Sequence, residues 1–282
     1  MTATSTPEAV LYCQGTFSIA NPTPAQTQQM LDAADDIGNS GFTTVILGQF
    51  HVHSDGGIYY NDSALDTVMA TLQTIPNRLK QAGNVQKVLV TFGPFWKDYT
   101  GIQNNLASFK TTMASLMSSC GIDGLDWDLE ENLDDYTSLL VDLTVWACGL
   151  GCIVTAAPYY DQSFWNSVLE QTTSAGGSFA WWNLQLYGGA TYAQWADQFP
   201  AAFLYPGYAN TQGATPSSIQ ADIANLGASY PALTGGFLWR YESIAGSGYT
   251  TAQFAQAILA GLPGASSSSR LPGGGEGCRA AS

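Results

Sequence analysis

The order of apolar and polar segments is the feature that most limits how this chain can fold. Short apolar runs alternate with polar loops and helix-like segments along its length. Strands that alternate with helices form parallel βαβ units, since a parallel pair needs a long crossover connection. Roughly eight such units in about 250 residues are typical of a closed barrel. We therefore predict an α/β fold, a single-domain (β/α)₈ TIM barrel.

The predicted elements follow one another as strand and helix from end to end of the barrel. We expect strands at residues 10–17, 44–50, 87–92, 124–130, 152–158, 182–187, 202–208 and 236–241. We expect helices near residues 24–39, 63–82, 102–119, 133–148, 162–174, 192–199, 216–228 and 251–259. A doubly wound sheet is the alternative fold, but no G-x-G-x-x-G segment follows the first strand to support it.

The two ends of the chain have a different composition from the rest. We predict a flexible N-terminus at 1–8, a catalytic barrel at 9–262, and a flexible linker or vector-derived tail at 263–282, where Gly, Ser and Pro dominate. No apolar run approaches the length of a transmembrane helix, and no signal peptide is visible. The scarcity of Lys and the abundance of Ser, Thr, Asn and Gln resemble extracellular enzymes, so we expect an extracellular location.

The net charge of the chain limits the partners that it can bind. The net charge is −14, with only 8 Lys and Arg residues. A nucleic acid or an anionic membrane is therefore disfavoured, because binding to either depends on basic side chains. Aromatic residues make up 12% of the chain, which favours a neutral polymer such as a glycan, bound on ring faces and through hydrogen bonds. We expect the protein to act as a monomer.

The chain has five cysteines, so at least one is unpaired. Cys148 and Cys152 flank a Gly-Leu-Gly turn and could pair if the geometry allows. Cys13 and Cys120 are predicted to be small buried residues. Cys278 lies in the tail, outside the predicted fold.

The segment 121–130 holds an unusual row of acids. Side chains alternate between the two faces of a strand, so Asp126, Asp128 and Glu130 point the same way. The residues between them are apolar and point into packing: Leu125, Trp127 and Leu129. Crowded carboxyls resist burial in their charged form. Such crowding can keep the last carboxyl protonated near neutral pH, so that it acts as an acid.

Other interpretations of this row are weaker. Acidic runs are usually solvated faces or disordered tails, but here apolar residues intervene and a hydrophobic helix pattern follows. A calcium loop has oxygen ligands at alternate positions without large apolar spacers, which Leu125 and Trp127 do not fit. His51 and His53 share one face after the second strand and could be metal ligands, but two histidines alone are a weak signal for a metal site. They are interpreted as residues that line a cleft or are satisfied within a loop.

Several motifs together resemble one enzyme family. The stretch 123–130 has the DGxDxDxE form of glycoside hydrolase family 18, and the chain is similar to its small hevamine-type (class III) chitinases. Supporting matches occur in the family's order: Thr155-Ala-Ala-Pro158, Gln185-Leu-Tyr187 and Leu238-Trp239. The segment Thr91-Phe-Gly-Pro94 stands where the family has Ser-x-Gly-Gly. The Pro is a departure that concerns the loop after the third strand.

The resemblance implies a retaining, substrate-assisted hydrolysis. Glu130 would protonate the glycosidic oxygen and later activate water. The substrate's own 2-acetamido carbonyl would be the nucleophile, giving an oxazolinium intermediate. Asp128 would orient the acetamido N–H, and Asp126 would share a proton with Asp128. Tyr187 would donate a hydrogen bond to the acetamido oxygen. This chemistry needs no metal and no organic cofactor.

The resemblance also assigns substrate-binding residues. Trp239 would form the apolar floor of the sugar pocket, followed by a cis peptide bond, and Gln185 and Tyr12 would support that pocket. Asp123 lies on the opposite face from the other acids, which predicts a structural role. Asn61-Asp-Ser is a formal glycosylation acceptor, a motif with many false positives.

Three functions remain open at this stage. The first is a chitinase that cleaves β-1,4 bonds between N-acetylglucosamine units of chitin and chitooligosaccharides. The second is an endo-β-N-acetylglucosaminidase that acts on N-glycans or another N-acetylated polymer. The third is a non-catalytic chitin-binding lectin on the same barrel. Lectins of this kind typically lose the acid at the position of Glu130 or Asp128, and both are present here. The loops that set the length of the cleft would separate the first two.

Overall fold

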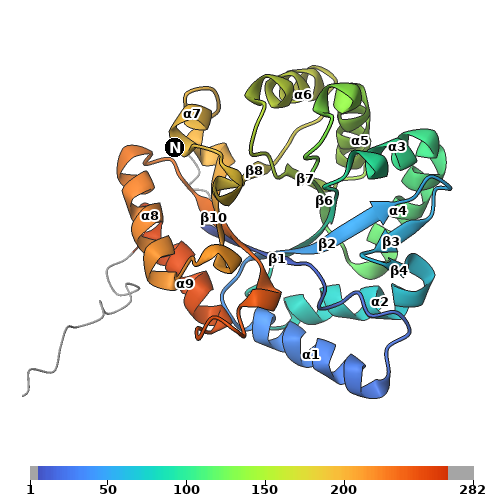
Figure 1. Ribbon diagram of the computed structural model, residues 1–282, viewed down its shortest axis with the longest axis horizontal. Coiled ribbons are helices and arrows are strands. Elements are labelled where there is room, and N and C mark those ends of the chain that lie inside the picture. Colours follow the sequence, from blue (N-terminus) through green and yellow to red (C-terminus); the bar gives the residue numbers. More distant parts are fainter. Residues whose placement is uncertain (1–5, 266–282) are drawn as a thin grey trace, which may run out of the picture.

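The computed structural model describes residues 6–265. Within this range, eight parallel strands close into a barrel, in the order β1-β10-β9-β8-β7-β6-β5-β2, and β2 returns to pair with β1. The helices surround the ring of strands (Figure 1). The strands are β1 (Glu8–Cys13), β2 (Thr44–Val52), β5 (Lys87–Phe92), β6 (Gly124–Trp127), β7 (Ile153–Ala156), β8 (Trp181–Leu184), β9 (Leu204–Ala209) and β10 (Gly235–Trp239). The predicted TIM barrel is confirmed.

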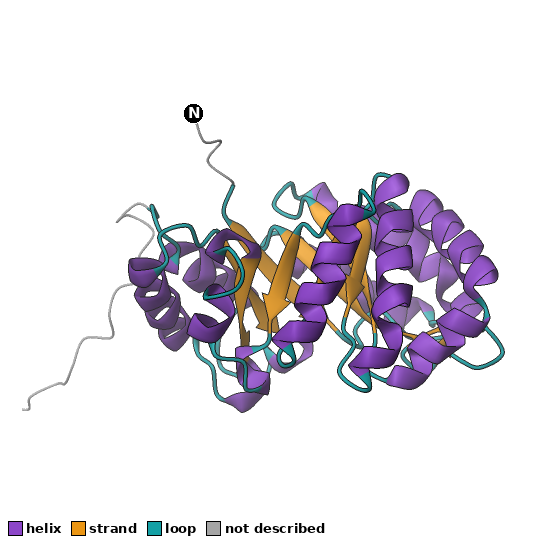
Figure 2. Ribbon diagram, turned by 90° about the horizontal axis from the view of Figure 1, so that it is seen from above, coloured by secondary structure: helices purple, strands orange, loops and turns teal. Residues whose placement is uncertain are grey.

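The helices pack on the outside of the barrel (Figure 2). They are α1 (Pro24–Gly38), α2 (Leu65–Gln81), α3 (Trp96–Asn104), α4 (Leu106–Cys120), α5 (Thr137–Gly149), α6 (Gln162–Ser174), α7 (Tyr192–Ala196), α8 (Pro216–Ser229) and α9 (Thr251–Gly261). Several begin with a Thr that accepts a hydrogen bond from the first turn. Thr23, Thr215 and Thr250 each complete a capping box in this way.

Two local features differ from the sequence prediction. The helix predicted at 102–119 is two helices, because Asn105 leaves the helical conformation with φ −124° and ψ 28°. A small hairpin also extends the sheet beyond β2, with β3 (Ile58–Tyr60) antiparallel to β2 and followed by β4 (Ser63–Ala64). The sequence pattern predicts only a polar loop in this region. Strands of two and three residues are too short to show an alternating pattern.

Five strands end earlier than predicted. They are β1, β6, β7, β8 and β10, which end at Cys13, Trp127, Ala156, Leu184 and Trp239, whereas the apolar pattern extended them to 17, 130, 158, 187 and 241. The residues beyond each strand end continue into the loops at the C-terminal end of the barrel. After β6 and β8, the side chains of Asp128, Glu130 and Gln185 form part of the polar cluster described below.

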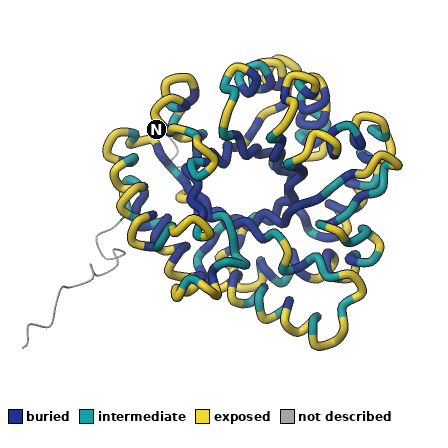
Figure 3. The backbone as a smooth tube through the Cα atoms, in the orientation of Figure 1, coloured by how far each residue is buried: buried dark blue, intermediate teal, exposed yellow. Residues whose placement is uncertain are grey.

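The barrel strands bury side chains on both faces, which gives two apolar layers. Along β1, Val10 and Tyr12 point into the barrel interior, while Ala9 and Leu11 join the larger layer between strands and helices. The interior layer also includes side chains from five other strands: Ile46, Leu89, Trp181, Tyr205 and Phe237. The strands form a continuous buried ring (Figure 3). The alternation of residues between the two layers shows which side chains point into the barrel interior.

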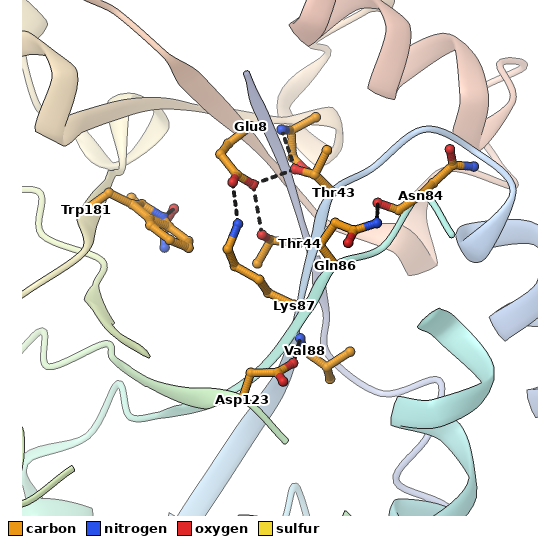
Figure 4. Close-up of polar contacts among 11 residues, drawn as sticks. Glu8, Thr43, Thr44, Asn84, Gln86, Lys87, Val88, Asp123 and Trp181 are labelled. Atoms are coloured by element: carbon orange, nitrogen blue, oxygen red, sulfur yellow. Dashed lines mark hydrogen bonds and ion pairs between the residues drawn. The ribbon is translucent and has the colours of Figure 1, made fainter. Parts of the chain in front are cut away.

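An ion pair closes the N-terminal end of the barrel interior. The Glu8 carboxylate pairs with Lys87 Nζ and accepts hydrogen bonds from Thr43 Oγ1 at 2.6 Å and Thr44 Oγ1 at 3.1 Å (Figure 4). Lys87 Nζ also lies 5.8 Å from the ring centroid of Trp181. The barrel thus begins at Glu8. The predicted flexible ends fall mostly on 1–5 and 266–282, which lie outside the described residues.

The four cysteines within the described part of the chain are free thiols. Cys13 and Cys120 are buried, as predicted. Cys148 and Cys152 are not joined: Cys148 Sγ donates to the carbonyl oxygen of Ser178 at 3.2 Å, and Cys152 Sγ lies 3.6 Å from a Met sulfur. Cys278 lies outside the described residues. No helix within 6–265 is long and apolar enough to cross a membrane.

Candidate active site

The predicted row of acids lies at the C-terminal end of β6. Asp126 is fully buried, Asp128 is 4% exposed, and Glu130 is half-buried at the end of the row. The alternating residues are buried in the outer apolar layer, as predicted: Leu125, Trp127 and Leu129. Successive carboxyls on one strand face are only two residues apart, so the backbone itself imposes their crowding.

Asp126 is held by hydrogen-bond donors from three other strands. Its Oδ2 accepts from Tyr12 Oη at 3.0 Å, and its Oδ1 accepts from Thr155 Oγ1 at 2.5 Å and from Asn183 Nδ2 at 3.3 Å. Asn183 also donates to Tyr12 Oη at 2.9 Å. Burial raises the pKa of Asp126, and these donors oppose that rise. Tyr12 therefore lies directly beside the acid row.

Asp128 lies between two glutamine amides. Gln185 Nε2 donates to its Oδ1 at 3.0 Å and Gln49 Nε2 donates to its Oδ2 at 2.9 Å. Burial, then the charges of Glu130 and Asp126, raises the pKa of Asp128 well above its usual range. A hydrogen bond with Glu130 acts in the same direction. Both neighbouring acids thus affect Asp128, and the effect of Glu130 is larger than that of Asp126.

Glu130 faces the open end of the barrel. Its Oε1 accepts from Gln185 Nε2 at 2.9 Å, and its carbonyl oxygen accepts from Tyr160 Oη at 3.0 Å. Burial raises the pKa of Glu130, while the hydrogen bonds from Gln185 and Asp128 oppose the rise. Among the ion pairs within residues 6–265, none involves Asp126, Asp128 or Glu130. The pKa values of the row are therefore raised by burial and, at Asp128, also by the neighbouring negative charges.

Aromatic rings pack next to the acids. The Trp239 ring lies 5.5 Å from the ring of Tyr12, and the Tyr187 ring lies 6.0 Å from that of Phe237. The phenol of Tyr187 is close enough to Asp128, Glu130 and Asp126 for their charges to raise its pKa, after the larger effect of burial. The Trp239–Arg240 peptide bond is cis, as the resemblance implied.

The loop after β5 packs directly against the acid row. Gly93 has φ +133°, and a Cβ atom at this position would lie 2.0 Å from the carbonyl oxygen of Asp128. Only glycine therefore fits here. The next residue, Pro94, follows a cis bond and accepts a hydrogen bond from Glu130 N at 3.1 Å. The Pro that departs from the family pattern thus supports the backbone of Glu130.

A depression of about 930 Å³ opens on one side of the acids, between the β2–β3 hairpin and the start of α3. Its lining includes both histidines, the exposed rings of Phe95 and Trp96, and Glu131, the neighbour of Glu130. The predicted place of His51 and His53 at a cleft is thus confirmed. His51 Nδ1 lies 3.0 Å from Oδ2 of the buried Asp98, and the His53 ring stacks on Tyr59 at 3.9 Å.

A second depression, of about 520 Å³, lies on the other side. Tyr159 and Tyr160 form one edge of it, and the residues that follow β8 form the other. Tyr160 links this depression to the acids through its bond to the Glu130 carbonyl. Within residues 6–265, no group of three or more His, Cys, Asp or Glu side chains is arranged to hold a metal ion.

The structure adds Gln49 and Asn183 to the predicted site. Asn183 lies on β8, two residues before Gln185, so strand parity was a signal that could have found it. Gln49 had no such signal, because the pairing of β2 with β5 shifts register between Leu47 and Phe50. This irregularity turns Gln49 toward the acids, although parity from Ile46 places it on the outer face.

Two other predictions concern residues outside this cluster. Asp123 has a structural role, as expected from its parity: its Oδ2 accepts from Val88 N at 2.7 Å and pairs with Lys80 Nζ at 2.6 Å. The Asn61 amide nitrogen is bonded to the carbonyl oxygen of Gln14 and, at 3.0 Å, to Ser18 Oγ. A side chain engaged in this way is a poor acceptor for a glycan in the folded protein.

Comparisons with known proteins show similarity of fold. No protein-family model matches the chain, and no curated protein matches it. Among solved structures, the catalytic domain of a family GH18 chitinase from the fern Peteris ryukyuensis has a TM-score of 0.60 at 19% identity, over 88% of this chain and 97% of that one. The Ostrinia furnacalis Group IV chitinase, in complex with allosamidin, has a TM-score of 0.62 at 15% identity, over 89% and 97%.

A bacterial structure gives a similar result. The class V chitinase from Pseudomonas fluorescens has a TM-score of 0.61 at 11% identity, over 90% of this chain and 99% of that one. At these identities the shared feature is the barrel, and fold alone does not decide an activity. The chemistry has to be argued from the side chains at the site.

Proposed function

We propose that this protein is a retaining glycoside hydrolase that cleaves β-1,4 bonds in polymers of N-acetylglucosamine. The observation that supports this most is the pair of carboxyls of Asp128 and Glu130 at the open end of the barrel, which both accept from the same Gln185 amide. Both carboxyls have raised pKa values, and neither has a cationic partner within the described residues. A carboxyl that keeps its proton near neutral pH beside an open cleft is suited to protonate a leaving oxygen.

In the proposed reaction, Glu130 donates its proton to the glycosidic oxygen as the bond to the anomeric carbon breaks. The acetamido carbonyl of the same sugar attacks that carbon and forms an oxazolinium ion. Asp128 accepts a hydrogen bond from the acetamido N–H, and its negative charge stabilises the ring. Glu130, now ionised, removes a proton from the water that opens the oxazolinium ion. The anomeric configuration is retained after two inversions.

The remaining residues would hold the sugar in place. Tyr187 donates its phenol hydrogen to the acetamido oxygen, and the pKa raised by burial keeps that hydrogen in place. Trp239 supplies an apolar face for the sugar ring, and Tyr12 packs against Trp239 while it bonds Asp126. Gln185 donates to both Asp128 and Glu130, and so fixes the two carboxyls relative to one another.

The glycan would extend to both sides of Glu130. The depression lined by Phe95 and Trp96 lies on one side and the depression lined by Tyr159 and Tyr160 lies on the other. Exposed rings beside polar groups suit sugars, which have apolar faces and polar edges. Openings on two sides favour cleavage within a chain. We further propose that the protein acts as an extracellular monomer, without a cofactor and without a nucleic-acid or membrane partner.

Hydrolysis of fluorogenic chitobiose and chitotriose glycosides tests the proposal. The unmodified chain and a Glu130→Gln variant are assayed together, with allosamidin as a binding probe for both. We expect turnover by the unmodified chain only and allosamidin binding by both proteins. Binding of chitooligosaccharides without turnover would support the lectin alternative instead. Absence of both binding and turnover would direct the search to N-glycans and other N-acetylated polymers.

A further inference from the structure

Gln49 contacts the acid row from the side opposite Gln185. It is 7% exposed, and its Nε2 donates to Asp128 Oδ2 at 2.9 Å. An amide nitrogen can only donate a hydrogen bond, so the oxygen that it faces has to accept. Oδ2 is therefore the carbonyl-like oxygen of Asp128 whenever this carboxyl is protonated.

The other oxygen of Asp128 has room for a proton. Gln185 Nε2 has two hydrogens and three acceptors within reach: Asp128 Oδ1 at 3.0 Å, Glu130 Oε1 at 2.9 Å and the carbonyl oxygen of Ala157 at 2.7 Å. Two hydrogens cannot fully satisfy three acceptors. The Oδ1 atom and Glu130 are thus the place where an additional hydrogen completes the bonding.

Asn61 holds Gln49 in this position. Its Oδ1 accepts from Gln49 N at 3.1 Å, and its own N donates to the Gln49 carbonyl oxygen at 2.7 Å. Asn61 has φ +48°, a conformation that Asn adopts more readily than most residues. The Asn61 side chain also bonds the end of β1. The hairpin that includes β3 and β4 therefore fixes the backbone of Gln49, whose side-chain amide faces Asp128.

We infer that Gln49 is a positioning residue that keeps the proton shared by Asp128 and Glu130 on the Oδ1 side, facing Glu130. The Gln49 amide donates a hydrogen bond to Asp128 Oδ2, and this oxygen is therefore not available as a proton site. The proton can then pass between Asp128 and Glu130 without rotation of the carboxyl. The inference deepens the proposed function and rests on it for its kinetic consequence, but the position of the proton is a property of the protein alone.

Two substitutions test the inference. Gln49→Met keeps much of the side-chain volume and removes the donor. We expect kcat to fall about 10- to 100-fold, the loss typical of one hydrogen bond to a charged group. KM should change little, since Gln49 contacts the carboxyl and not the sugar. Gln86→Met is the matched control, since the Gln86 amide bonds only neighbouring carbonyl groups at the other end of the barrel.

The pH dependence of activity in a Gln49→Glu variant tests the inference more directly. In this variant the introduced carboxyl can donate to Asp128 Oδ2 when it is protonated and cannot when it is ionised. We therefore expect this variant to recover activity as pH falls, while Gln49→Met shows no such recovery. A change that was merely structural would not produce a pH-dependent rescue. A folded Gln49→Glu variant with a pH profile of wild-type shape would overturn the inference.

Carboxyl titration followed by ¹³C NMR separates this inference from the proposed function. Loss of a donor to the ionised form raises a carboxyl pKa, so the Asp128 pKa should be higher in Gln49→Met than in the unmodified chain. If the unmodified chain hydrolyses nothing, the proposed function fails and the titration still decides the role of Gln49. An unchanged Asp128 titration in folded Gln49→Met would refute that role. If Gln49→Met does not fold, the same comparison is made with Gln49→Glu.

Discussion

The two ends of the barrel surround their carboxyls in different ways. At the N-terminal end, the buried Glu8 pairs with Lys87, and the partly exposed Asp123 pairs with Lys80 of α2. At the C-terminal end, Asp128 and Glu130 lie among amides, a phenol and each other, and their pKa values are raised. The carboxyls with a cationic partner serve structure. The carboxyls without one have raised pKa values, which suits them to proton transfer.

The largest expected effect of a single substitution is at the C-terminal end. Glu130→Gln removes the proton donor and preserves the shape of the side chain. We expect kcat to fall by about 10²- to 10⁴-fold, the usual contribution of a general acid and base. Thermal unfolding should be little changed. Hydrolysis of a chitotriose glycoside measures the first effect, and residual activity within tenfold of the unmodified chain would contradict the role of Glu130.

At the N-terminal end we expect the reverse, a loss of stability without a loss of activity. Lys87→Met leaves the Glu8 carboxylate without its cation at 11% side-chain exposure. Breaking a buried pair in this way costs about 3 kcal/mol of folding free energy. Urea unfolding measures this loss, while kcat of the folded protein should stay unchanged. The double variant Glu8→Gln/Lys87→Met should recover most of the loss. A fall in kcat without a loss of stability would remove the contrast between the two ends.

A pH-dependent change of stability sharpens the comparison. Burial and the neighbouring charges raise the pKa of Asp128 in the folded protein. The folded state thus binds this proton more tightly than the unfolded state, and stability is lost as pH rises through the folded pKa. Asp128→Asn removes this loss of stability, because an asparagine side chain has no carboxyl to ionise. We expect the variant to be inactive and more stable near neutral pH by about 1 kcal/mol.

Below the ordinary pKa of an aspartate this gain should vanish, because both states of the unmodified chain are then protonated. Unfolding by urea at neutral and at acid pH measures the difference. A gain of equal size at both pH values would mean that packing, and not charge, explains it.

Strand parity explains which residues the sequence could predict. Asp126 lies on a strand with regular pairing and Asp128 directly after it, so alternation predicted that they share one face, whereas Tyr12 was assigned from the family resemblance. Asp123 was assigned to structure by the same argument. Gln49 follows a register shift in β2, where alternation fails. The β3–β4 hairpin has no pattern long enough to recognise, so the depression beside it could not be described from the sequence.

The smallest expected effect lies on the rim of the cleft, where no buried charge is involved. Phe95→Ala and Trp96→Ala each remove an exposed ring from the larger depression. One aromatic contact contributes about 0.5–1.5 kcal/mol, so KM for chitohexaose should rise by roughly 2- to 12-fold. KM for a short glycoside should not change, because a short glycoside does not reach the depression.

Leu150→Ala is the control, since Leu150 is 50% exposed in the loop between α5 and β7, at the opposite end of the barrel. If both ring variants cleave long and short substrates like the unmodified chain, the glycan does not cross this side. The functional end of the barrel would then be limited to the acids and the rings next to them.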